Sequence, residues 1–128
     1  MPARCFLRAK IHGLTLTGAD VAYEGSMALC PELLRAAGIL PFERIDVYNL
    51  DNGERLTTYA IEGGPKEACL NGAAALKGAP GQRVIVAAYA WLEEGELDGF
   101  TPVVVHPDGD NAPASVRRHA VRPGLDIS

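Results

Sequence analysis

The 128-residue sequence lacks the features that mark membrane, disulfide-rich and nucleic-acid-binding proteins. None of its apolar runs approaches the ~20 residues that a membrane-spanning helix needs, so we expect no membrane partner. Its three cysteines, Cys5, Cys30 and Cys69, are odd in number and widely spaced, which predicts free thiols in a reducing compartment and not a disulfide framework. The net charge is −4 and no basic cluster is larger than Arg117-Arg118, so we expect no nucleic-acid partner.

Signals for metal binding and for export are missing as well. His12, His106 and His119 have no metal-ligand spacing with the cysteines, so we expect no metal site. Residues 1–10 include basic side chains, but neither an apolar core nor a small-residue cleavage site follows, which argues against a signal peptide. We therefore expect a cytoplasmic protein.

The residues that are present predict one mainly β domain over residues 1–128. Apolar residues make up 48% and charged residues 22% of the chain, a balance typical of a folded protein. Glycine and proline are spread throughout, and valine, isoleucine and threonine come in short bursts, as in a small barrel of short strands. The predicted strands are Arg4–Gly13, Ser26–Leu29, Arg44–Leu50, Glu54–Ile61, Ala68–Leu70, Arg83–Trp91 and Thr101–His106.

Two short helices and one hairpin complete the expected layout. Pro31–Gly38 has proline in its first turn and glycine just past its end, and Asn71–Gly78 has asparagine placed to cap and glycine placed to stop. Asp51-Asn52-Gly53 between two strands predicts a hairpin. The Asp-, Gly-, Asn- and Pro-rich stretch Pro107–Ser115 predicts a mobile C-terminal tail.

Strand alternation across this hairpin predicts one polar and one apolar face. The polar face contains Asp46, Tyr48, Arg55, Thr57 and Tyr59, and the other contains Ile45, Val47, Leu56, Thr58 and Ala60. Alternation in the first strand predicts a second polar row of Arg8, Lys10 and His12. Taken singly, each row is typical of a solvated face, with Arg55 expected in a surface ion pair with Asp46 or Glu54.

The dipeptide Gly25-Ser26 has chemistry beyond that of a turn if the Gly25 carbonyl is held against the Ser26 hydroxyl. Attack by the hydroxyl converts the peptide to an ester, and β-elimination then leaves a dehydroalanine that hydrolyses to a pyruvoyl group and ammonia. Glycine tolerates the dihedrals that such an attack requires. A hydroxyl such as that of Thr58 would stabilise the oxyanion formed on the way.

A second candidate feature is the predicted helix start Asn71-Gly72-Ala73-Ala74. Unpaired main-chain N–H groups at a helix start attract carboxylates, and small residues let a ligand approach the backbone. Lys10 and Arg55 are candidate cations for the same ligand, and Arg55 could bind a carboxylate through two hydrogen bonds.

Together these pieces resemble the pyruvoyl-dependent aspartate 1-decarboxylases. The resemblance runs from about Phe6 to Ala88, and the order and spacing of its motifs agree. The motifs include Lys10-Ile11-His12, Ala19-Asp20, Tyr23-Glu24-Gly25-Ser26, Ala36-Ala37-Gly38-Ile39-Leu40, Ile45-Asp46-Val47, Asn52-Gly53, Thr58-Tyr59-Ala60-Ile61 and Asn71-Gly72-Ala73-Ala74-Ala75.

The resemblance implies a small six-stranded double-psi β-barrel, a homotetramer, and active sites between neighbouring subunits. It implies autocatalytic cleavage between Gly25 and Ser26 into a short β chain (1–25) and a longer α chain (26–128). It also implies decarboxylation of L-aspartate to β-alanine and CO2 for pantothenate biosynthesis, through a Schiff base on a pyruvoyl cofactor. A maturation helper protein for the cut is left open.

The resemblance also assigns roles to individual residues. Ser26 becomes the pyruvoyl group and Tyr59 is the proton donor, while Gly25, Ser26 and Thr58 act in maturation. The implied substrate-binding residues are Lys10, Arg55, Thr58, Gly72, Ala73 and Ala74. Pocket-wall positions are His12, Tyr48 and Asn71.

Two alternatives stay open on the sequence. One is an unprocessed small barrel that binds an acidic metabolite. The other is a pyruvoyl decarboxylase that acts on glutamate, because a pocket discriminates one methylene only by ~10- to 200-fold.

Overall fold

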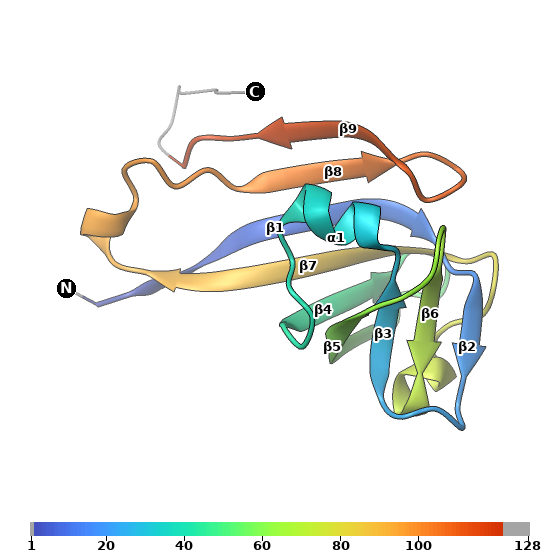
Figure 1. The fold of residues 1–128 in the computed structure, drawn as a ribbon. Helices are drawn as coiled ribbons and strands as arrows, with labels where there is room; N and C mark the ends of the chain where they lie inside the picture. The colour runs from blue at the N-terminus through green and yellow to red at the C-terminus, as the bar shows by residue number, and fades with distance from the viewer. Residues whose placement is uncertain (1, 122–128) are drawn as a thin grey trace.

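The computed structural model describes residues 2–121 and is mainly β, with few short helices (Figure 1). The strands are β1 (Arg4–Thr15), β2 (Gly18–Asp20), β3 (Ser26–Leu29), β4 (Arg44–Asn49), β5 (Arg55–Glu62), β6 (Ala68–Asn71), β7 (Arg83–Leu92), β8 (Val103–Pro107) and β9 (Pro113–Arg118). The helices are α1 (Pro31–Ala37) and the 3-10 segments η1 (Gly72–Lys77) and η2 (Glu94–Glu96). The predicted mainly β class with short helices is confirmed.

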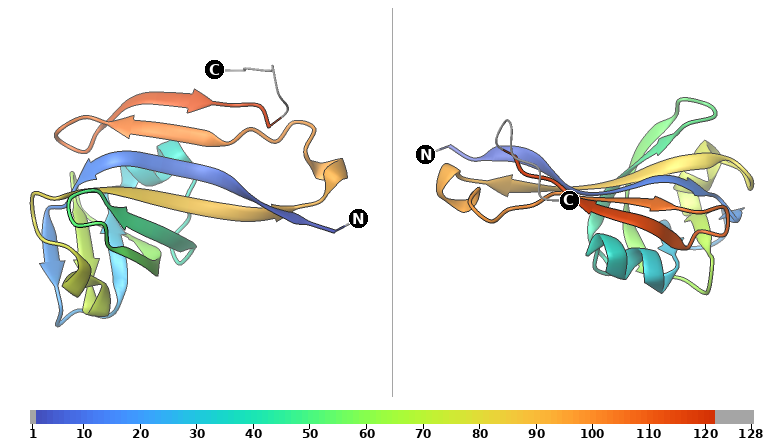
Figure 2. Two further views of the ribbon diagram at one scale, coloured as in Figure 1. Left: turned by 180° about the vertical axis from the view of Figure 1, so that it is seen from behind. Right: turned by 90° about the horizontal axis from the view of Figure 1, so that it is seen from above.

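The strands are hydrogen-bonded in the order β2-β6-β3-β5-β4-β7-β1-β8-β9. The pairs β1 with β8, β2 with β6 and β3 with β5 are parallel, and the remaining neighbours are antiparallel. The sheet curls, so that β2, β6 and β3 lie at a large angle to β1 and β7 (Figures 1 and 2). The long strands β1 and β7 extend beyond β4 and β5. This arrangement is barrel-like, and closure as a six-stranded double-psi barrel stays a prediction.

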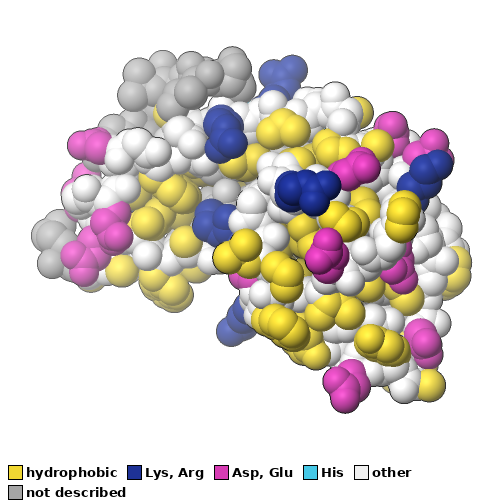
Figure 3. Space-filling view, viewed as in Figure 1, with side chains coloured by type: hydrophobic (Ala, Val, Ile, Leu, Met, Phe, Trp, Pro, Cys, Tyr) yellow, Lys and Arg dark blue, Asp and Glu magenta, His cyan; other side chains and the backbone are white. Residues whose placement is uncertain are grey.

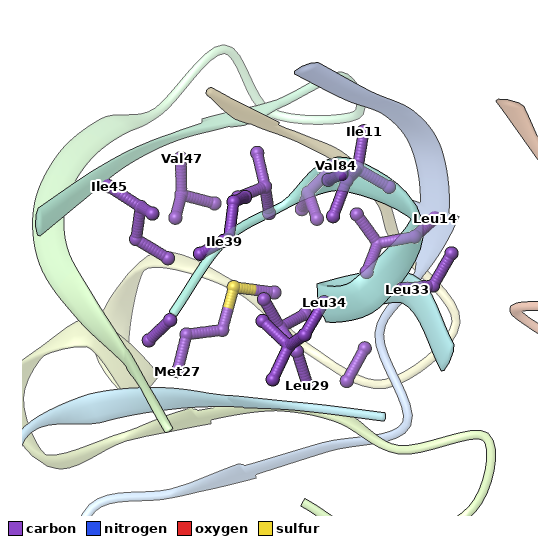
Figure 4. Packing of buried hydrophobic residues seen from close by; sticks show 14 of the residues in the cluster. Ile11, Leu14, Met27, Leu29, Leu33, Leu34, Ile39, Ile45, Val47 and Val84 are labelled. Carbon is purple, nitrogen blue, oxygen red and sulfur yellow. The ribbon is translucent and has the colours of Figure 1, made fainter. Parts of the chain in front are cut away.

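The core lies inside the curled sheet and is covered at one end by α1 (Figure 4). Along β1, Ala9 and Ile11 are fully buried while Lys10 and His12 are half-buried, as alternation requires. All four residues of β3 are buried, so this short strand has no solvent-facing side, and Met27 points into the middle of the cluster. Burial on both faces fixes the register of β3, and with it the position of Ser26.

The hairpin faces are confirmed by the pairing of β4 with β5. Ile45 and Val47 are buried, whereas Asp46 pairs with Thr57 and Tyr48 with Arg55 on the opposite face. The predicted polar row on β1 is only partly correct. A register shift between Leu7 and Ala9 directs Arg8 towards the Gly38 carbonyl, to which it donates at 3.0 Å, and into an ion pair with Glu43.

The predicted mobile C-terminal tail is wrong for the part of it that the structure describes, whereas residues 122–128 lie outside the described residues. Residues Pro113–Arg118 form β9, which pairs antiparallel with β8. The loop before it is fixed by Asn111, which is 2% exposed and donates to the carbonyls of Thr15 (2.8 Å) and Lys66 (3.0 Å). The three-residue strand β2 was also not predicted, because Gly-Ala-Asp has low β propensity and its pairing with β6 is long-range.

Candidate active site

The backbone around Ser26 is placed by three neighbouring strands, because β3 lies between β6 and β5. Ser26 pairs directly with Asn71 of β6. On the other side, Met27 pairs in parallel with Ala60 of β5. Extending this parallel register towards the N-terminus of both strands places Ser26 beside Tyr59, and Gly25 beside Thr58. Segments far apart in the sequence therefore meet at the predicted cleavage point.

The Ser26 hydroxyl is held in place although it is almost inaccessible, with 1% of the residue exposed. The Asn71 amide donates from Nδ2 to Ser26 Oγ at 3.1 Å, and Ser26 Oγ donates to the Glu24 carbonyl at 3.3 Å. The Cys69 thiol donates to Asn71 Oδ1 at 3.4 Å, which fixes the orientation of the amide. The prediction that Asn71 caps a helix is wrong, because its side chain makes no capping hydrogen bond and binds Ser26 instead.

Gly72 is packed against the peptide that is predicted to break. Its φ is +62°, and a β-carbon built there would lie 2.6 Å from Gly25 Cα and 2.7 Å from Gly25 N. Only a residue without a side chain fits at both this dihedral and this contact. Gly25 itself does not have a positive φ, and a β-carbon there would meet no atom within 4 Å. The expected role of Gly25 in allowing unusual dihedrals is therefore not visible in this conformation.

We expect Gly72→Ala to lower the free energy of unfolding by about 2–4 kcal/mol, because it adds left-handed strain to a steric overlap with Gly25. Chemical denaturation measures this effect. Gly53→Ala is the matched control, since Gly53 has a φ of +75° but open space around it, and it should cost only about 1 kcal/mol. Equal losses in the two variants would show that the contact with Gly25 does not matter.

A cleft of about 460 Å³ opens beside this peptide. It brings together five of the residues that the sequence assigned to the site: Gly25, Thr58, Tyr59, Ala73 and Ala74. It also contains three that the sequence analysis missed: Leu56, Thr57 and Lys77. One wall is β5 and the other is η1, so an anionic ligand would lie between a strand edge and a turn of small residues.

Thr58 and Tyr59 both reach the cleft although they alternate on β5. The strand pairs with β4 over Arg55–Tyr59 but with β3 only from Ala60 onward. The edge of β5 that faces away from β4 is therefore free just before Ala60, and the cleft follows this edge, so consecutive residues line it. The Ala60 N–H donates to the Glu43 carbonyl on the β4 side of the strand, so alternation turns the N–H groups of Thr57 and Tyr59 towards the open edge.

The Tyr59 ring is stacked against Phe42, with centroids 6.1 Å apart and planes inclined by 28°. Phe42 adopts a φ of +70°, which is unusual for an aromatic residue, and its N–H donates to the Ala60 carbonyl at 2.6 Å. The four-residue turn from Leu40 to Glu43 is closed by a hydrogen bond from the Glu43 N–H to the Leu40 carbonyl. This tight turn holds one face of the Tyr59 ring.

Four other predicted site residues lie outside the cleft, on the outer face of β1, β7, β4 and β5. Cross-strand pairing puts His12, Ile85, Tyr48 and Arg55 in one row, and Lys10, Ala87, Asp46 and Thr57 in the next. The second row reaches the cleft through Thr57. Within one chain, Lys10, His12, Tyr48 and Arg55 therefore form a polar surface that adjoins the cleft but does not line it.

This outer face has its own internal contacts. The Arg55 guanidinium lies 4.2 Å from the centre of the Tyr48 ring, so the expected surface ion pair of Arg55 is replaced by a cation–π contact. The Tyr48 and Tyr89 hydroxyls are 2.8 Å apart, and this hydrogen bond, with desolvation, raises the pKa of Tyr89 to about 12. Tyr89 was not predicted, because its contact with Tyr48 joins two strands and residues 41 positions apart in the sequence.

His12 shares this face with His106, and their ring centroids are 5.5 Å apart. Burial lowers the pKa of His12, and the charges of Lys10, His106 and Arg83 lower it further. We expect Lys10→Met to raise this pKa towards the ordinary value, which a ¹H NMR titration of the imidazole measures. An unchanged titration in the variant would contradict the assigned cause.

The same shift has a consequence for stability. The unfolded chain takes up this proton more readily than the folded one, so the contribution of His12 to stability is present above pH ~6.5 and falls as the pH drops towards the lowered folded pKa.

Comparison with known proteins identifies the family of this chain. Residues 2–114 match the family model described as aspartate decarboxylase. An aspartate 1-decarboxylase from Thioalkalivibrio sulfidiphilus is 48% identical over 123 residues, covering 94% of this chain and 92% of the relative. The corresponding proteins of Hydrogenobaculum sp. and Salinibacter ruber are 48% and 52% identical, over 90% and 82% of this chain and 92% and 73% of theirs.

The site and fold define a small, mainly β protein whose buried serine adjoins a cleft with a phenol and small residues. The chain belongs to the aspartate decarboxylase family.

Proposed function

We propose that the chain is a carboxy-lyase that converts L-aspartate to β-alanine and CO2. The observation that carries the proposal is the cleft, which joins Gly25 to Thr58, Tyr59 and Ala73 immediately beside the buried Ser26. Membership of the aspartate decarboxylase family and the named activity of the relatives support the same reaction.

The proposed maturation begins at the Gly25-Ser26 peptide. Ser26 Oγ attacks the Gly25 carbonyl, and the peptide nitrogen is replaced by the oxygen as an ester forms. Elimination then breaks the bond between Cβ and Oγ, which releases residues 1–25 with a carboxylate at Gly25 and leaves dehydroalanine at 26. Water converts this residue to a ketone with loss of ammonia. In this proposal the Asn71 amide, which donates to Ser26 Oγ, orients the hydroxyl, and Thr58, beside Gly25 in the extended strand register, stabilises the oxyanion.

The residues around the cut fit a pyruvoyl group at position 26. Position 72 has no room for a side chain, because a β-carbon on Gly72 would overlap with residue 25. Asn71 supplies an amide donor to the oxygen of residue 26. When formed, such a group supplies an electron-withdrawing carbonyl for decarboxylation. Tyr59 then delivers the proton to the former α-carbon, and the walls Leu56, Ala73 and Ala74 limit access of water.

We propose that the active protein is a homotetramer with its active sites between neighbouring subunits. Lys10, His12, Tyr48 and Arg55 lie on an outer face, where they could complete the cleft of a neighbour. Large apolar side chains are exposed among the charged ones (Figure 3). Phe42 is 77%, Leu76 76% and Trp91 71% exposed, which is typical of surfaces that become buried on assembly.

The proposal places the reaction in the cytoplasm and in pantothenate biosynthesis. Cys5, Cys30 and Cys69 are all free, as expected in a reducing compartment. Among the described residues no helix has the length and apolar character that crossing a membrane requires.

Denaturing mass spectrometry of the purified protein, followed by assays with L-aspartate and L-glutamate, tests the proposed function. We expect two fragments divided between residues 25 and 26 in place of one 13.6-kDa chain, and β-alanine from aspartate. An intact chain without decarboxylation would favour the alternative of an unprocessed binding protein. Preferred turnover of glutamate would change the substrate and keep the cofactor.

A further inference from the structure

Asn71, the residue that holds the Ser26 hydroxyl, is itself oriented by the thiol of Cys69. Among the described residues this thiol is the one group that donates to Asn71 Oδ1, at 3.4 Å, while Asn71 Nδ2 donates to Ser26 Oγ at 3.1 Å. Cys69 and Asn71 are two positions apart on β6 and therefore share a face of that strand. The sulfur lies beside Gly18 of β2, where a β-carbon would come within 3.2 Å of it. A chain of two hydrogen bonds thus runs from the thiol to the oxygen that is proposed to attack.

The direction of these bonds matters because a side-chain amide can turn over. If the Asn71 amide turned by 180°, Oδ1 would face Ser26 Oγ and accept its proton, and Nδ2 would face sulfur, which is a weak acceptor. The amide would then donate nothing to the serine oxygen. In the observed orientation the hydroxyl proton points to the Glu24 carbonyl at 3.3 Å, and the amide N–H can stabilise negative charge that develops on Oγ during attack.

The surroundings of Cys69 keep its thiol protonated. Desolvation raises the pKa of the thiol, the negative charges of Glu67 and Asp20 raise it further, and a hydrogen bond from the Asp20 main chain opposes the rise. Among the described residues, Glu62 and Tyr23 are the other titratable groups that line the same hollow. The thiol therefore carries its proton at neutral pH, as a hydrogen-bond donor must.

We propose that Cys69 is a positioning residue for the self-cleavage, because its thiol sets the Asn71 amide in the orientation that prepares the Ser26 hydroxyl for attack. This inference rests on the proposed function, since it concerns the rate of the same maturation step. In that step Oγ bonds to the Gly25 carbonyl carbon, the bond from that carbon to the Ser26 nitrogen breaks, and the hydroxyl proton ends on this nitrogen as an amine forms. Cys69 touches none of the reacting atoms and acts only through Asn71.

The rate of self-cleavage in freshly synthesised protein, followed by denaturing mass spectrometry, tests this role. Cys69→Ala should slow the appearance of fragments 1–25 and 26–128 about three- to tenfold, because a hydrogen bond that orients the amide is lost. Cys69→Ser should restore the rate to within about twofold of the unmodified chain, because a hydroxyl also donates. Equal slowing in both variants would overturn the proposal, since a donor at position 69 would then be irrelevant.

Cys30→Ala is the matched control for the loss of a thiol hydrogen bond. Cys30 is 3% exposed, and its thiol donates to the Asn111 carbonyl at 3.4 Å, the same distance as in the bond from Cys69. It follows the end of β3 that is remote from Ser26. Cys30→Ala should lower stability and leave the cleavage rate unchanged. A rate that falls as far in this variant as in Cys69→Ala would mean a general loss of stability in place of positioning.

The pH profile of cleavage gives a readout that needs no alanine variant. In the unmodified chain the rate should fall about three- to tenfold as the pH rises through the raised pKa of the Cys69 thiol, since a thiolate cannot donate. Cys69→Ser keeps its proton in this range, and all other titrating groups are the same in both proteins. The rate of Cys69→Ser relative to the unmodified chain should therefore increase with pH. A ratio that stays constant between neutral pH and about pH 11 would overturn the role of the thiol.

The outcomes separate this inference from the proposed function. An unmodified chain that is cut, with Cys69→Ala cut at the same rate, would overturn the role of Cys69 alone. An unmodified chain that stays intact would overturn the proposed maturation itself.

Discussion

The variant Ser26→Ala should remain a single chain of full length and have no detectable decarboxylase activity. Alanine has no oxygen to attack the Gly25 carbonyl, so neither the cut nor the ketone can form. The site should otherwise persist, because β3 is held between β5 and β6 by main-chain pairing. Loss of the acceptor for the Asn71 amide should cost about 1–3 kcal/mol of stability. Denaturing mass spectrometry and circular dichroism measure processing and folding separately.

Two further variants keep this experiment decisive. Ser26→Cys retains a nucleophile at the same position and should show slow cleavage, which would prove that the variants fold well enough to react. Ser115→Ala changes a serine on β9, far from the cleft in the sheet order, and should be processed normally. Normal two-chain processing of Ser26→Ala would refute the assignment of the cleavage point.

The variant Tyr59→Phe should be processed normally and lose turnover by a factor of at least ~100, because it lacks the phenolic proton donor. Phenylalanine keeps the ring that stacks on Phe42 and the main-chain pairing with Arg44, so the geometry of the cleft should be conserved. The loss should fall on kcat with KM little changed, since the proton is needed after the substrate is bound.

Tyr89→Phe is the matched control for this measurement. It removes a hydroxyl from a phenol that does not line the cleft, and it should retain most of the turnover. Unchanged turnover in Tyr59→Phe would remove Tyr59 from the mechanism, whereas failure of that variant to cleave would assign its phenol to maturation.

Much of this site was predictable because its signals are local. Ser26–Leu29 is a strand with the predicted bounds, since a short apolar run after a Gly-Ser turn can be buried on both faces. The hairpin faces followed from alternation alone. Helix α1 followed from the proline at its start and from Gly38, which has the left-handed φ of +70° typical of a helix end.

The remainder depended on contacts between distant segments. Nothing near Lys77 indicates that two asparagines of another hairpin would hold it at the cleft. Alternation put Thr58 and Tyr59 on opposite faces and did not show that both line the cleft, because the free edge of β5 results from where β3 begins to pair. Asn71 was assigned to a cap by its position before a helix, whereas its partner Ser26 lies 45 residues earlier.

Under the proposed cleavage, the pairing of the first strands determines what becomes of residues 1–25. β1 is joined to β7 along almost its whole length and also to β8, and β2 is joined to β6. Ala9 and Ile11 belong to the common core. The segment should thus stay bound as two integral strands of the mature protein, separable only by denaturation, so that the proposed scission would create a reactive group without dismantling the scaffold.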